Sequence, residues 1–287
     1  MSTMSFQNML NYVNLGPIPW DRHLVLAAAA AGGFPLATYL VFSYRGWLAL
    51  GRGGLPANPL GYLINVALHV IARTDVRAPA PYELEGLEEA YGPWARRSFF
   101  VPAGASLPER VGPRPDVPSY VAPQRQTSEP AAPRMVARME AFLAAAVAAN
   151  PGVLETRPSR LEGPSHDAMW LADGLTARPR FLKGTNGEFA HVHGEGSTHL
   201  ILSLTDATRA IELFWAERHS LSGGPGGHIP WNYVLLYAPR SEEELAVWKM
   251  FITASARFVT TAAGGPPDIS IPPSPWGEYV HKSQLEA

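Results

Sequence analysis

The sequence predicts an α+β protein, in which a largely antiparallel sheet is covered by about three helices and preceded by a membrane-anchoring helix. An uncharged run near the start, a proline-rich middle, and short strand-like pieces alternating with amphipathic helices in the last half predict this class. The expected parts are a tail and anchor (1–45), a second helical segment (46–100), an extended arm (101–133), the main catalytic domain (134–265) and a C-terminal tail (266–287).

The composition excludes several classes of function. The 287 residues carry a net charge of −2 at pH 7, so no basic field is available to hold a nucleic-acid backbone. The chain has no cysteine, which excludes disulfides, thiolate nucleophiles, iron–sulfur clusters and zinc–thiolate sites. Any metal ion would have to bind to histidine and carboxylate side chains.

The first predicted element is a helix over Leu24–Phe42, where 19 consecutive residues carry no charge. At ~1.5 Å per residue this helix spans about 28 Å, close to the ~30 Å of a bilayer core. The alanines of Ala27–Ala31 and the kink expected at Pro35 make the run only mildly hydrophobic. An uncleaved membrane anchor is the favoured interpretation, and a buried core helix and a signal peptide are the alternatives.

Arginines are distributed unevenly about this run. Arg22 alone precedes it, whereas four follow it soon after: Arg45, Arg52, Arg73 and Arg77. The positive-inside rule then places the bulk of the chain in the cytosol. We therefore expect a membrane-associated protein at the endoplasmic reticulum, with lipid as one partner.

A second helix is predicted to begin at Asn58, a good N-cap, with Pro59 at its first position, and to continue to about Arg73. Its apolar stripe fits a membrane interface or the surface of the main domain equally well. Eight prolines then fall within Val101–Pro133, which predicts an extended arm. Tyr120, Val121 and the run Gln124–Gln126 give this arm side chains that can bind.

The main domain is predicted to begin with an amphipathic helix over Arg134–Ala149. Two more helices are expected, from Thr205 to about His219 and from Ser241 to about Thr260, the last with a capping box of Ser241 and Glu244. The predicted strands are Val153–Thr156, Ala168–Ala172, Arg180–Lys183, Phe189–His193, Thr198–Leu204 and Asn232–Tyr237.

Three histidines lie in the predicted hairpin. His191 and His193 point to one face of a strand because the side-chain period is two. His199 joins them if the loop has three or five residues, and faces the other side if it has four. Three imidazoles on one face can bind a metal ion, accept protons near neutral pH, or serve only the structure, and metal-free catalysis or substrate binding is favoured.

A second candidate cluster is Glu217-Arg218-His219, at the predicted end of a helix. The glutamate can orient the histidine, and the arginine can hold an enolate or carboxylate. Arginine and histidine also suit a helix C-terminus without any catalytic role. The remaining candidates for substrate binding are four aromatic residues that could line a flat pocket, although such residues more often belong to the core: Trp215, Trp231, Tyr233 and Tyr237. Arg240, at the end of a strand, is a candidate binding arginine.

Four strings carry a family resemblance: F-A-H-V-H at Phe189–His193, T-H-L-I-L at Thr198–Leu202, W-A-E-R-H at Trp215–His219 and L-Y-A-P-R-S-E-E-E at Leu236–Glu244. In combination they resemble the luciferases of bioluminescent fungi and their non-luminous relatives. Gly112–Pro115 and Ala122–Gln126 are similar to the arm of that family, so we expect the arm to dock on the domain.

The resemblance implies an enzyme that oxidises 3-hydroxyhispidin, a hydroxypyrone, with molecular oxygen and without a metal or organic cofactor. A histidine would remove a proton, the enolate would react with oxygen, and the endoperoxide would lose carbon dioxide. The residues to which the resemblance assigns catalysis are His191, His193, His199, His219 and Glu217, and those assigned to substrate contacts include Arg218 and Arg240. Activity is then expected to survive chelators.

The chain departs from the luminous pattern at two places. The turn Gly194–Ser197 is short, where luminous members have a longer turn, and Ser220 follows E-R-H where they have proline. Light emission is therefore left open. The alternatives are a non-luminous relative that acts on another phenol or pyrone, and a non-catalytic membrane-tethered binding protein. An enzyme is expected to bring His193 and His219 to one cavity lined by aromatic residues such as Tyr237.

Overall fold

The computed structural model describes residues 22–79, 87–100, 107–175, 177–224, 229–266 and 268–270, with the backbone alone for 22–32, 88, 89 and 165. Two compact units are distinguished, Met1–Ala49 and Leu50–Ala287. The predicted division at residue 45 lies close to the boundary between these units. The predicted C-terminal tail lies almost wholly outside the described residues.

Among the described residues of the first unit there is one helix, α2 (Arg22–Ala49), which confirms helical structure over the predicted run and extends it by two residues at its start and seven at its end. Pro35 lies inside this helix. Several apolar side chains of its second half are exposed, among them Phe34 and Phe42. In the part of the chain that the structure describes, no helix combines the length and the apolarity needed to cross a bilayer. The predicted membrane span is therefore not supported.

The second unit is built on a six-stranded sheet of order β1-β2-β3-β4-β6-β5, in which every neighbouring pair is antiparallel. The strands are β1 (Leu154–Ser159), β2 (Gly163–Leu171), β3 (Glu188–Val192), β4 (Thr198–Ile201), β5 (Ala216–Arg218) and β6 (Tyr233–Leu236). The α+β class with an antiparallel sheet is confirmed.

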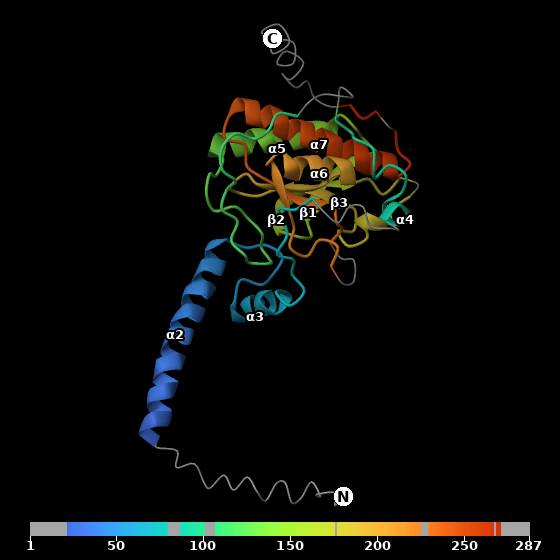
Figure 1. Cartoon of the computed structure of the whole chain (residues 1–287). Helices are drawn as coiled ribbons and strands as arrows, with labels where there is room; N and C mark the ends of the chain where they lie inside the picture. The colour runs from blue at the N-terminus through green and yellow to red at the C-terminus, as the bar shows by residue number, and fades with distance from the viewer. Residues whose placement is uncertain are drawn as a thin grey trace, which may run out of the picture. The chain divides into compact units, whose positions relative to one another are not determined.

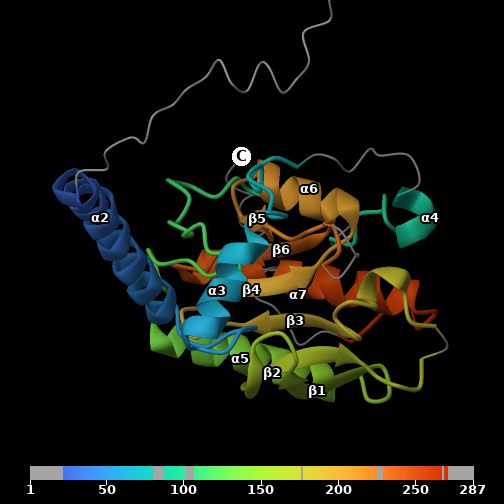
Figure 2. The same ribbon diagram turned by 90° about the horizontal axis from the view of Figure 1, so that it is seen from below.

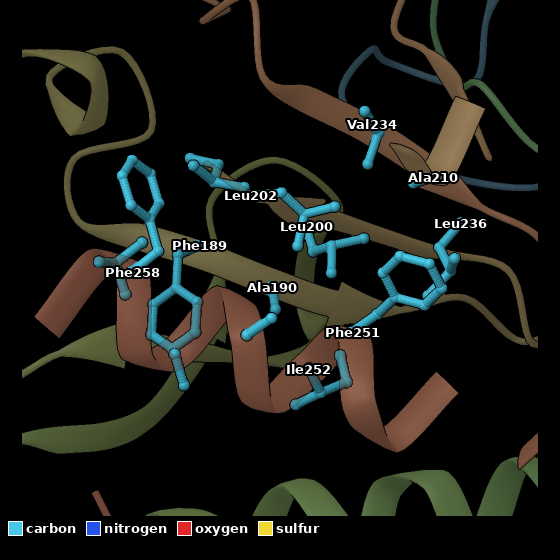
Figure 3. Packing of buried hydrophobic residues seen from close by; sticks show 14 of the residues in the cluster. Phe189, Ala190, Leu200, Leu202, Ala210, Val234, Leu236, Phe251, Ile252 and Phe258 are labelled. Atoms are coloured by element: carbon cyan, nitrogen blue, oxygen red, sulfur yellow. The ribbon is translucent and has the colours of Figure 1, made fainter. Parts of the chain in front are cut away.

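Three helices cover one face of this sheet, as predicted (Figure 1): α5 (Pro133–Ala148), α6 (Leu204–Glu212) and α7 (Glu242–Ala262). Alternate strand residues such as Ala190 and Leu200 point toward α7 (Figure 3) and are buried with Phe251 and Phe258 of that helix. Burial of this apolar surface is the main source of stability, because each large side chain contributes about 1.5–3 kcal/mol of transfer free energy.

The opposite face of the sheet is covered by irregular chain and by α3 (Pro59–Leu68), which lies across β3 and β4 in Figure 2. The Asn58 side chain caps α3 by accepting from the Gly61 amide at 3.0 Å. The Asn65 side chain accepts from the amides of Val121 and Ala122 and so ties α3 to the arm. The described part of the arm, from residue 107, is extended and docked, which confirms that expectation.

Two elements differ from prediction. Arg180–Lys183 is not a strand, and a 3-10 helix occupies Arg180–Leu182. The predicted helix from Thr205 to His219 ends instead after Glu212, because Phe214 adopts a left-handed backbone with φ of 64°. The chain then turns into the edge strand β5, which carries Glu217 and Arg218. The apolar side chains after Ile211 fit a helical period or a strand, so the period could not locate this break. A short helix not predicted, α4, spans Leu87–Tyr91.

Candidate active site: a buried histidine cluster

The three hairpin histidines face the same side of the sheet. His191 lies directly opposite His199 in the β3–β4 register. The amide of His193 donates to the carbonyl of Ser197 at 2.8 Å, which closes a three-residue turn. Gly196 in this turn has a φ of 94°, and a Cβ atom there would come within 2.6 Å of Ala131 of the arm. Of the loop lengths that the sequence left open, the structure has three residues, one of the two lengths that align His199 with its neighbours.

The imidazole rings form one compact cluster. Their centroids are 5.1 Å apart for His191 and His193, 4.9 Å for His193 and His199, and 5.4 Å for His191 and His199. All three side chains are buried, and none is more than 2% exposed. The arm closes the cluster, since His199 donates through Nε2 to the carbonyl of Gln124 at 3.3 Å.

His219 joins this cluster from the end of β5. Its ring centroid lies 5.4 Å from that of His199, and Tyr233 contacts both rings, at 5.8 Å from His219 and 4.7 Å from His199. The convergence of hairpin and distal histidines is therefore present. The expectation that His219 ends a helix is wrong, because it follows an edge strand, and the aromatic partner in the cluster is Tyr233.

Two carboxylates complete the cluster. The Oε1 atom of Glu162 lies 3.7 Å from His191 Nε2 and 3.4 Å from His193 Nε2. Glu188 accepts from His191 Nδ1 at 2.7 Å and is itself held by the Ser159 hydroxyl. Each carboxylate is buried within the sheet.

The carboxylates divide the histidines by charge. Burial opposes the imidazolium of His191, but interactions with Glu162 and Glu188 outweigh it and raise its pKa to about 9. Burial, with repulsion from His191 and His193, lowers the pKa of His219 to about 4 and holds the pKa of His199 well below its usual value. In this state of the protein His191 carries a proton at neutral pH, whereas His199 and His219 are neutral acceptors.

Glu217 lies beside the cluster on the same face of the sheet. Its carboxylate accepts from the Tyr237 hydroxyl at 2.9 Å, from Arg77 at 3.1 Å and from Gln124 at 3.3 Å. Glu217 and Gln124 line a cavity of about 500 Å³, together with Ser220, the residue after His219. The site therefore has a neighbouring space of the size of a small-molecule pocket.

The other sequence candidates lie apart from the histidines. Arg218 is bound by the carbonyl and carboxylate of Asp75, and Trp231 lies beneath the guanidinium of Arg73 at 4.0 Å. Trp215 is buried near Phe251 on the helix-covered face.

Arg240 is bound to Glu244 and to the carbonyl of Val111. Among the described residues, the contacts named here for Trp215 and for Arg240 do not involve the histidine cluster.

Two site residues, Glu162 and Glu188, were not among the candidates that the sequence offered. Glu188 precedes the F-A-H-V-H string directly, and an acidic residue beside paired histidines was a usable signal. Glu162 lies in the β1–β2 turn, 29 residues before His191, and only the register of the sheet brings it there. Together, Glu162, His191 and His193 form a group whose ligand atoms all lie within 4.8 Å of one another, a spacing that could hold a metal ion.

Comparisons with known proteins agree with the motifs at this site. A family described as "Luciferase domain" matches residues 186–255, which run from β3 into α7. A luciferase of Armillaria ostoyae is 30% identical over 266 residues, covering 84% of this chain and 88% of its own. The chain belongs to the luciferase family of fungi. Luciferases of Armillaria gallica and Neonothopanus nambi are 30% and 28% identical over a similar share. No solved structure matches the chain.

Membership of the luciferase family supports a luciferase-like enzyme function. The matched domain contains all four clustered histidines and Glu217. It does not include Glu162, Gln124 or Arg125, which come from the β1–β2 turn and the arm.

Proposed function

We propose that the protein is a luciferase-like oxygenase that uses molecular oxygen on a hydroxypyrone such as 3-hydroxyhispidin. The observation that carries this proposal is the buried cluster of four histidines beside a cavity of about 500 Å³. A general base must be neutral to accept a proton, and His199 and His219 meet that condition at neutral pH. Membership of the luciferase family supports the same reaction class.

The proposed reaction begins with proton removal from the hydroxypyrone. His199 is the best placed acceptor, since its Nδ1 atom has no hydrogen-bond partner among the described residues and its Nε2 atom donates to Gln124, which lines the cavity. The enolate formed then reacts with oxygen, and the resulting endoperoxide loses carbon dioxide. The positive charge of His191 would help to stabilise the developing enolate. Arg218 was predicted for this role, but its guanidinium is already bound to Asp75.

The test is incubation of the full chain with 3-hydroxyhispidin in air, with oxygen uptake and photons followed together. We expect oxygen uptake that His199→Gln reduces. Ser203→Ala is the control, because Ser203 is a buried polar side chain that caps α6 on the helix-covered side of the sheet. Absence of uptake under these conditions would contradict the proposal.

The same experiment separates the alternatives. Uptake without photons keeps the oxygenase and indicates a non-luminous relative. Saturable substrate binding without uptake favours the non-catalytic binding protein. The turn Gly194–Ser197 and Ser220, where the chain departs from the luminous pattern, both lie next to the proposed site. We therefore expect photon emission to be lost more readily than oxygen uptake.

We also propose that α3 holds the enzyme at a lipid surface. Its inward side chains, Tyr62 and Asn65, pack on the protein, whereas its apolar side chains face outward: Leu60 (63% exposed), Leu63 (62%), Ile64 (38%) and Val66 (45%). A helix that packs on a core turns its apolar face inward. The apolar face of α3 is turned outward, which suits a membrane interface. This proposal replaces the anchor expected from α2, and location at the endoplasmic reticulum stays a prediction.

Co-sedimentation with phosphatidylcholine vesicles tests it. Leu60→Glu with Leu63→Glu should reduce binding, whereas Val111→Glu should not, because Val111 is a single exposed apolar side chain on the arm. Equal binding of both variants would contradict a role for α3.

A further inference from the structure

We propose that the Oε1 atom of Glu162 and the Nε2 atoms of His191 and His193 bind one divalent first-row transition-metal ion, with Fe²⁺ the expected occupant. The site itself is inferred from geometry, and only the expectation of iron rests on the proposed function. The inference departs from the cofactor-free reaction that the sequence resemblance implies.

The spacing of the ligand atoms fits one ion. Two ligands about 2.1 Å from a metal lie about 3.0 Å apart at a right angle and about 3.4 Å apart at a tetrahedral angle. The Glu162 Oε1 atom is 3.4 Å from His193 Nε2 and 3.7 Å from His191 Nε2. All three ligand atoms lie within 4.8 Å of one another, so side-chain shifts alone would complete the coordination.

Both imidazoles present an unpaired nitrogen to this point. Within the described residues, His191 Nε2 and His193 Nε2 are buried and have no hydrogen-bond partner. Leaving a buried polar atom unpaired costs about 1–3 kcal/mol. Two unpaired imidazole nitrogens therefore lie close to one oxygen of Glu162. A metal ion bound by both nitrogens and by that oxygen would satisfy all three atoms.

The opposite ring nitrogens are held as in known metal sites. His191 Nδ1 donates to Glu188 at 2.7 Å, and His193 Nδ1 donates to Ser197 at 2.8 Å. The Ser197 hydroxyl in turn donates to Glu195. A carboxylate or hydroxyl that accepts from Nδ1 fixes the tautomer with a free lone pair on Nε2, which is the form that binds a metal.

Glu162 is fixed in the same way. Arg125 binds its Oε2 atom, which leaves Oε1 to face the histidines. The main chain packs tightly here, since a Cβ atom at Gly53 would come within 2.5 Å of Glu162 Oε2. Two histidines and one carboxylate on one side of an ion leave other positions open, an arrangement typical of non-haem Fe²⁺ oxygenases. His199 is the nearest further imidazole.

The test uses the full chain, freed of metal by a chelator and then titrated anaerobically with Co²⁺ or Fe²⁺. Co²⁺ binding is followed by visible absorption, and the bound metal is counted by elemental analysis. We expect about one ion per chain. Glu162→Gln and His191→Gln should each weaken Co²⁺ binding by more than about 100-fold, and Glu188→Gln by about 10–100-fold, the range for residues that orient a ligand.

Glu217→Gln is the matched control, since Glu217 is an equally buried carboxylate bound to Tyr237 instead of to the histidines. Its Co²⁺ affinity should be unchanged. Circular dichroism identifies any variant that fails to fold, and His193→Gln then replaces it.

Two outcomes overturn the site: no stoichiometric binding by the folded parent chain, or Co²⁺ affinities for Glu162→Gln and His191→Gln that equal that of the parent. In that case a proton on His191, instead of a metal ion, supplies the positive charge between Glu162 and Glu188. The failures remain distinguishable. Metal binding without oxygen uptake rejects the proposed function and keeps the site, whereas oxygen uptake by a parent chain that binds no Co²⁺ rejects the site and keeps the function.

Discussion

The two faces of one sheet differ in what fills them. On the helix-covered face, side chains such as Ala190 and Leu200, which pair across β3 and β4, pack against α7 in an apolar layer. On the arm-covered face, the alternate residues of the same strands are His191 and His199, which meet carboxylates and main-chain carbonyls. Alternation along one hairpin therefore separates the source of stability from the source of chemistry.

The faces also differ in how the cover is attached. Helices α5, α6 and α7 come from the chain that flanks the strands and are held by apolar contact. The arm is held by polar bonds, for example Gln126 Oε1 accepting from the Ala238 amide at 2.8 Å and Arg110 forming an ion pair with Glu244 of α7. Substitutions on the two faces should therefore change different measured quantities.

The largest expected effect is on activity. His193→Gln should reduce turnover by about 10²–10⁴-fold, the range that positioned proton transfer contributes. Because His193 is buried and bonded to Ser197, we also expect a loss of about 1–3 kcal/mol of unfolding free energy from unpaired partners. Turnover and urea unfolding of the same preparation measure both. Turnover within a factor of ten of the parent would remove His193 from the catalytic site.

Phe251→Ala should show the opposite pattern. Phe251 is fully buried on α7, and removal of such a ring costs about 3–5 kcal/mol of unfolding free energy. Turnover per folded molecule should stay close to that of the parent, because the ring is on the face away from the histidines. If Phe251→Ala abolished turnover while folded, the two faces would not be functionally separate.

The apolar face was the predictable one. Helical period located α5 and α7 to within a residue or two, and strand alternation placed His191 beside His193. The loop between β3 and β4 then decided the side on which His199 lies. These features depend on local spacing alone.

The polar face depends on contacts that are remote in sequence. Glu162 reaches the histidines through the register of β1, β2 and β3, and Gln124 through docking of the arm. The left-handed backbone of Phe214 converts an expected helix end into the strand that carries Glu217. A single sequence has no local signal for any of these three.

Arg125→Met tests whether the polar face also contributes to stability. Arg125 and Glu162 form a buried ion pair, and removal of one partner leaves the other charge unpaired at a cost of about 3 kcal/mol. We expect that loss in urea unfolding together with reduced turnover. Arg125→Met combined with Glu162→Gln should recover part of the stability and none of the turnover. A loss below about 1 kcal/mol would show that the histidines already compensate Glu162.

The smallest expected effects concern helix caps on the apolar face. Ser241 Oγ accepts from the Glu244 amide at 3.3 Å at the start of α7, and Ser203 Oγ accepts from the Asp206 amide at 3.1 Å at the start of α6. Of the two hydrogen bonds of the predicted capping box, the one to the Ser241 side chain is formed. The Glu244 side chain accepts from the Arg240 amide instead of the Ser241 amide.

Replacing a capping serine by alanine costs about 0.5–2 kcal/mol. Ser203 is fully buried, so the Asp206 amide cannot turn to water when the hydroxyl is removed, whereas Ser241 is half-buried and the Glu244 amide can. We therefore expect Ser203→Ala to lie near about 2 kcal/mol and Ser241→Ala near about 0.5 kcal/mol, with turnover unchanged in both. Urea unfolding with an oxygen-uptake assay measures the pair. Equal losses of unfolding free energy would show that burial does not determine how much a capping serine contributes here. A change in turnover in either variant would show that α6 or α7 influences the active site on the opposite face of the sheet.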